Sequence, residues 1–207
     1  MRATALESEA LAWVVPHRNG RHLMRTREWL LRLRPDAGEA LVLAALLHDV
    51  DRNVDAGALD RHVAAWNEPA AVQAHAERAA EVAAAWLRSE GADEPLVSAV
   101  AGLISRHETG GGEDADALQA ADSLSFLEVN PAAVWVQEAR TSRADAERKL
   151  RWMHDRIRLE EARAVAAPLL ERALAELVGA ASVVQDGALA GRLRRQANEG
   201  RAHGNTR

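Results

Sequence analysis

Apolar residues recur along the chain at intervals of three and four positions, which is the spacing of one face of an α-helix. Proline and glycine interrupt this spacing between the segments and mark the helix boundaries. A further long segment begins with a capping pair, Ser142 and Asp145, and Pro168 is expected to kink or split it. The earlier part of the chain is predicted to form helices over roughly residues 4–15, 20–35, 59–66, 69–89, 93–107 and 114–128.

Residues 38–48, with the sequence GEALVLAALLH, are apolar on nearly every face instead of on one. A helix that is apolar all round is buried. This segment is therefore predicted to be the central helix of the fold, and it ends in the polar pair His48-Asp49.

The composition favours helices. Alanine, leucine, glutamate and arginine dominate, whereas tyrosine is absent and phenylalanine occurs once, which predicts an all-α helical bundle. The 207 residues are 48% hydrophobic, enough apolar surface to close one core. We expect one helical domain over residues 1–186, followed by a mobile basic tail at 187–207, where five arginines accompany a single acid.

Charge and cysteine content exclude several classes of function. The net charge of −5 gives no chain-wide reason to bind a nucleic-acid polymer. The absence of cysteine excludes disulfides, thiolate zinc sites and iron–sulfur clusters, so any metal must be bound by nitrogen and oxygen. Neither a signal peptide nor an uncharged apolar run of about 18 residues is present, and we therefore expect a cytoplasmic protein without membrane contact.

Several polar residues occupy helix positions that the apolar pattern predicts to be buried. His48-Asp49 closes the most apolar helix, and Asp122 interrupts the run LQAADSLSFL, where an unpaired carboxylate would cost several kcal/mol. A divalent cation would compensate it, and His75 and His107 would supply donors for a second ion, about 3.5–4 Å from the first. The alternatives are a His-Asp dipeptide that merely ends a helix and histidines that are merely packed.

The order of these residues resembles the H…HD…D signature of the HD-domain superfamily. His22 stands in HLMR, similar to a His-x-x-Arg form of the first ligand, and LLHDVDR is similar to the family's apolar helix followed by HD. The resemblance covers roughly residues 20–128, and the extra histidines resemble its dinuclear branch. It implies two divalent ions (Fe, Mn, Co, Ni or Zn) held by His22, His48, Asp49, His75, His107 and Asp122, with Asp49 bridging them.

Basic residues near the motif are candidates for binding an anionic substrate. Arg52 stands where the family's HDIGK form has a lysine, and an arginine there could clamp a phosphate bidentately and assist Asp49 in catalysis. The alternative is a solvated loop residue. Four further substrate-binding candidates are Arg25, Arg106, Lys149 and Arg156, the last two on one helix face.

The resemblance implies a phosphohydrolase acting on a phosphomonoester or phosphodiester, expected to be a nucleotide or another small phosphorylated molecule. The alternative is a mixed-valent di-iron oxygenase that cleaves a C–C or C–P bond of a small polar substrate, because the same six ligands serve both classes. A Gly-Tyr-Pro segment is absent, which disfavours the cyclic-di-GMP phosphodiesterase branch. The sequence leaves open whether the chain is a monomer or a homodimer.

Overall fold

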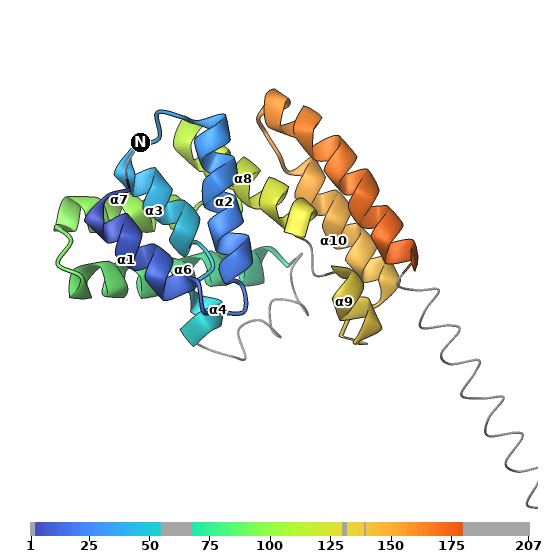
Figure 1. The fold of residues 1–207 in the computed structure, drawn as a ribbon, viewed down its shortest axis with the longest axis horizontal. Coiled ribbons are helices and arrows are strands. Elements are labelled where there is room, and N and C mark those ends of the chain that lie inside the picture. The colour runs from blue at the N-terminus through green and yellow to red at the C-terminus, as the bar shows by residue number, and fades with distance from the viewer. Residues whose placement is uncertain (1–2, 55–67, 130–131, 139, 180–207) are drawn as a thin grey trace, which may run out of the picture.

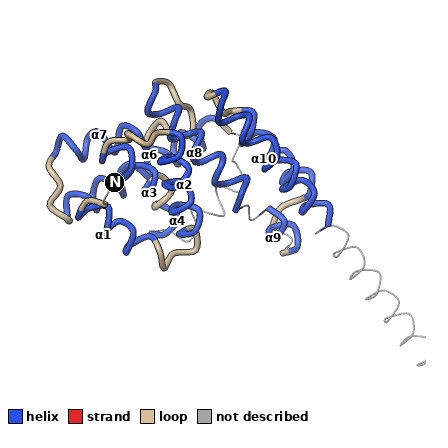
Figure 2. The backbone as a smooth tube through the Cα atoms, turned by 45° about the horizontal axis from the view of Figure 1, so that its top comes forward, coloured by secondary structure: helices blue, strands red, loops and turns tan. Residues whose placement is uncertain are grey.

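A computed structural model describes residues 3–54, 68–129, 132–138 and 140–179. These residues form helices joined by loops and turns, without a strand among them, as Figure 2 shows. The predicted all-α helical bundle is confirmed. The helices are α1 (Ala5–Val14), α2 (Gly20–Leu33), α3 (Glu39–Leu47), α4 (Asp51–Val54), α6 (Pro69–Ser89), α7 (Glu94–Ile104), α8 (Glu113–Val129), α9 (Ala132–Gln137), α10 (Arg143–Asp155) and a last helix over residues 160–179.

The central helix of the fold is α3, as its apolar sequence predicts. Every residue from Leu41 to Leu47 is buried, and α3 packs against α1, α2, α7 and α8. Helices α2 and α8 form the most extensive helix pair and lie beside it (Figure 1). His48, the C-cap of α3, therefore lies buried in the middle of the bundle.

Local sequence signals set several helix ends. The Asp93 side chain accepts a hydrogen bond from the backbone N–H of Leu96 (2.9 Å), and Ser142 accepts one from Asp145 (3.0 Å), so both are N-caps. The prediction that Pro168 splits the last segment is wrong. The break falls at residues 156–159, and the helix over 160–179 continues through Pro168. The helix predicted at 59–66 and the tail at 187–207 lie outside the described residues.

The last two helices lie side by side as a hairpin next to α8 and α9 (Figures 1 and 2). Leu150, Met153 and Ile157 are buried in the hydrophobic core, as is Ala166 of the last helix. This packing brings the end of α10 against the part of α8 that carries Asp122. No helix in the described part of the chain is long and apolar enough to span a bilayer.

Candidate metal centre

The six residues predicted as metal ligands converge in one place. His22 lies on α2, His75 on α6 and Asp122 on α8, while His48 and Asp49 follow α3 directly. His107 lies in the turn that follows α7. All are buried except His22, whose side chain is 13% exposed. Their ligand atoms form two groups that could each hold an ion: His22, His48 and Asp122; and Asp49, His75 and His107.

Asp49 lies between the two groups. Its Oδ1 is 2.8 Å from Nε2 of His75 and 4.0 Å from Nε2 of His107. Its Oδ2 faces the other group, 3.8 Å from Nε2 of His22 and 3.9 Å from Nε2 of His48. The two oxygens of one carboxylate therefore point to two different pairs of histidines, which is the placement that a bridging ligand requires.

Two of the histidines are oriented by backbone carbonyls that accept from their Nδ1 atoms. Nδ1 of His48 donates to the carbonyl of Ala45 (3.1 Å), and Nδ1 of His107 donates to that of Ile104 (2.7 Å). In each case Nε2 faces the cluster with its lone pair available. Nε2 of His107 is buried without a hydrogen-bond partner among the described residues. Such an orphaned acceptor fits a site that holds a cation.

His22 is oriented by a serine of the neighbouring helix. The Ser125 hydroxyl donates to the carbonyl of His22 (2.9 Å), so its oxygen is left to accept from Nδ1 of the same residue (2.8 Å). Nε2 of His22 then points to Oδ1 of Asp122 (3.1 Å) and lies 3.3 Å from Nε2 of His48. These two nitrogens and Oδ1 of Asp122 lie close enough together to bind one cation between them.

His75 has a carboxylate on each side of its ring, and sequence reasoning missed one of them. Nδ1 lies 3.0 Å from the buried Asp51, while Nε2 contacts Asp49. Burial opposes the charged imidazole, but the two hydrogen bonds outweigh it and raise the pKa of His75 to about 9. Asp51 is therefore positioned as a carboxylate that orients a metal-binding histidine through the ring nitrogen that does not bind the metal. Its position three residues after His48 was the available signal.

Asp122 has a second cationic partner besides the expected metal. Its Oδ1 faces the histidines, whereas its Oδ2 pairs with Arg156, which also pairs with the buried Glu108. Glu108 was missed by sequence reasoning, although it follows His107 directly. Together with His107 and Asp122 it forms a third group of potential ligands. The Arg156 guanidinium, 6% exposed, bridges the two carboxylates of this group.

Both aspartates of the cluster are held in the charged form. Burial alone would raise the pKa of Asp49, but Arg52, His48 and His75 hold it well below its usual range. For Asp122, burial is likewise outweighed by Arg156, His22 and His48, and the pKa lies well below normal. Burial lowers the pKa of His48 less than Asp49 and Asp122 raise it. The cluster therefore offers ionised carboxylates at neutral pH.

The predicted substrate-binding residues are not all at this site. Arg52 contacts Asp49 through Nη1 (2.8 Å) and lines a small cavity together with Lys149. Arg156 reaches the cluster but is engaged with its carboxylates. Arg25 is instead paired with Glu128 and Glu28, and Arg106 is exposed and donates to the carbonyl of Gly102. These two arginines line neither of the cavities at the cluster.

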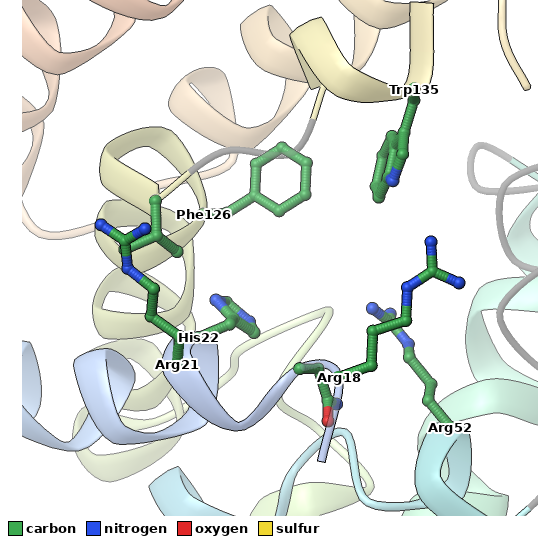
Figure 3. A pocket seen from close by; sticks show the side chains of 8 residues that line it. Arg18, Arg21, His22, Arg52, Phe126 and Trp135 are labelled. Atoms are coloured by element: carbon green, nitrogen blue, oxygen red, sulfur yellow. The ribbon is translucent and has the colours of Figure 1, made fainter. Parts of the chain in front are cut away.

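The small cavity shares His22, Arg52 and Phe126 with a wider pocket. Figure 3 shows this pocket, with His22 at its base and Trp135 opposite. The lining of the wider pocket is Arg18, Asn19, Arg21, His22, Arg52, Phe126, Val129 and Trp135.

The fold and the site define an all-helical protein with a buried His/Asp cluster that could hold metal. We compared the chain with protein-family models, with curated proteins and with solved structures, and none of these comparisons gave a match. The arguments for a function therefore come from the geometry of the cluster and its pocket.

Proposed function

We propose that the protein is a metal-dependent phosphohydrolase of the HD-domain type, with two divalent cations at the cluster. The observation that carries the proposal is the position of Asp49, whose two oxygens face two separate pairs of histidines. Imidazole and carboxylate ligands suit zinc, iron, manganese, cobalt and nickel. The ligand order along the chain, with His-Asp at the end of a buried helix, supports the HD-type assignment.

The charges around the cluster favour an anionic substrate. Four buried carboxylates, those of Asp49, Asp51, Glu108 and Asp122, face three basic side chains. Two divalent cations would balance the charge of the four carboxylates, and the basic side chains would then leave a net positive site. Such a site attracts phosphate esters. The three basic residues are Arg52, Lys149 and Arg156.

When bound, the cations would polarise a phosphoryl oxygen and lower the pKa of a water molecule so that it attacks phosphorus at neutral pH. The chain's own residues have defined tasks in this scheme. Asp49 bridges the two halves of the site and stays ionised. Arg52 lies beside Asp49 at the mouth of the small cavity, where its guanidinium neutralises charge that develops on the phosphoryl group.

Phosphate release from a panel of phosphomonoesters and phosphodiesters, measured after loading with Mn²⁺, Co²⁺, Ni²⁺ or Zn²⁺, tests the proposal. Asp49→Asn should lower kcat by two or more orders of magnitude, because an amide bridges two cations poorly. Arg106→Ala, an exposed residue outside both cavities, is the matched control and should keep full activity. Absence of phosphate release with every ester and metal would refute the proposal, and O₂ consumption with iron would point to the oxygenase.

A further inference from the structure

Two arginines of the wider pocket have no role in the metal centre. Arg18 and Arg21 line the pocket together with Arg52. Both are exposed, and neither has a carboxylate partner in the described part of the chain. On α2, which carries Arg21, Arg25 by contrast pairs with Glu128 and Arg27 pairs with Glu7. The guanidinium groups of Arg18 and Arg21 are therefore available to an anion from outside the chain.

The turn between α1 and α2 fixes the place of these arginines. A Cβ on Gly20 would lie 2.3 Å from the carbonyl oxygen of Val14, so only glycine allows the turn to close this tightly. The Asn19 side chain donates to the backbone carbonyl of Asp49 (3.0 Å). Because Asn19 lies between the two arginines, this bond ties them to the backbone of a metal ligand.

The opposite wall of the pocket is apolar and aromatic. Phe126 comes from α8 and Trp135 from α9, with ring centroids 6.2 Å apart and planes at 55°. Figure 3 shows the guanidinium groups of Arg18 and Arg52 extending into the opening below Trp135, whereas Arg21 extends away from them on the other side of His22. A ligand in this pocket would contact Arg18, Arg52, an aromatic wall and the metal centre together.

We propose that Arg18 forms, with Arg52, a second anion subsite, and that the pocket takes a nucleoside diphosphate. One phosphoryl group lies at the metal centre, the other contacts the arginines, and the base packs on Phe126 and Trp135. Aromatic faces stack on bases of any kind, and arginine binds phosphate bidentately. The inference rests on the proposed function, which by itself requires only one phosphoryl group, and names the substrate class.

Calorimetric titration of the metal-loaded protein with ADP, AMP and pyrophosphate, at a temperature where no phosphate release is detected, tests the subsite separately from turnover. The wild type should bind ADP more tightly than AMP. Arg18→Ala should weaken ADP and pyrophosphate binding by at least about tenfold and AMP binding much less, since a charge-assisted hydrogen bond contributes about 1.5 kcal/mol or more. Arg148→Ala removes the same charge from an exposed position of α10 and should change none of the affinities.

A substitution of Trp135 tests the contribution of the aromatic wall. Trp135→Leu should weaken ADP binding and leave pyrophosphate binding unchanged, because pyrophosphate has no base to pack on the ring. Equal binding of ADP and AMP by the wild type, or equal losses in the arginine variant and its control, would overturn the inference. Release of phosphate from p-nitrophenyl phosphate by metal-loaded wild type reports the proposed function separately, so either proposal can fail alone.

Discussion

Asp49 reaches both halves of the candidate centre because it follows His48 at the end of α3. Seven consecutive buried residues pack α3 into the middle of the bundle, and this packing fixes the position of the residues at its C-terminus. The His48 ring is fixed by its bond to Ala45, and Asp49 is then placed between the two groups of histidines. The predicted ligand pair is thus positioned by packing and not by a flexible loop.

Substitution of His75 should abolish metal binding by one of the two ligand groups and leave metal binding by the other group intact. In His75→Ala the second group keeps only Asp49 and His107, whereas His22, His48 and Asp122 remain intact. We expect the metal content to fall from two ions to one per chain, as measured by elemental analysis after dialysis. His154→Ala, outside the cluster, should keep both ions. An unchanged content in His75→Ala would contradict the assignment.

Lys149 is the chain's only lysine and is buried, 7% exposed, against the rings of Phe126 and Trp152. Burial lowers its pKa from 10.5 to about 8. Because the folded pKa lies below the unfolded one, the charged amine destabilises the fold below pH 8. This penalty disappears as the pH rises from about 8 to 10.5.

Lys149→Met should therefore raise the free energy of unfolding at pH 7 by roughly 1–3 kcal/mol, since it removes a buried charge. The gain should shrink as the pH rises from about 8 to 10.5 and disappear above that range, where the wild-type amine is neutral in both the folded and the unfolded state. Urea denaturation of the metal-free protein at pH 7 and pH 10 measures this difference. A variant that is less stable than wild type at pH 7 would show that the amine stabilises the fold.

At the scale of elements, the hairpin of α10 and the helix over 160–179 completes the centre from outside the predicted motif core. Its contribution is Arg156, the C-cap of α10, which pairs with Asp122 of α8 and with Glu108. The guanidinium also donates to Ser123 (2.9 Å) and lies over the ring of Trp152. The hairpin is thereby linked to the carboxylates that face the metal ligands.

Arg156→Met should destabilise the metal-free protein by about 3–5 kcal/mol, because it leaves two buried carboxylates without their cation. Added divalent metal should recover part of this loss through Asp122. Thermal unfolding followed by circular dichroism, with and without metal, gives both values. Arg151→Met, at an exposed position of the same helix, should change stability by no more than about 0.5 kcal/mol. Equal stability of the two variants would show that the bridge contributes nothing.

The sequence predicts the helices and the convergence of the six ligands well, because both follow from local patterns. Histidines and aspartates on apolar helix faces have to meet in the core that those faces build. Asp51 and Glu108 could not be separated from ordinary surface acids, because their burial depends on where α6 and α10 pack. Arg156 was expected at a substrate, and only the packing of α10 against α8 shows its bond to Asp122.

For the whole molecule, the ligands of the candidate centre come from segments spread over residues 22–122. Cations held there would connect α2, α3, α6 and α8 and the turn after α7. Binding to the folded state alone stabilises that state by mass action. The same buried cluster that suits catalysis would therefore also hold the bundle together.

Metal content of the purified protein tests the central claim most directly. Elemental analysis of anaerobically purified protein, with electron paramagnetic resonance after partial oxidation, should find close to two divalent ions per chain. We expect these ions to be manganese, cobalt, nickel, zinc or iron and to support phosphate release. We also expect the metal content of His75→Ala to be lower than that of the wild type. Two irons with a mixed-valent signal that responds to substrate would favour the oxygenase. A folded protein without stoichiometric metal would contradict the assignment of a metal centre to this cluster.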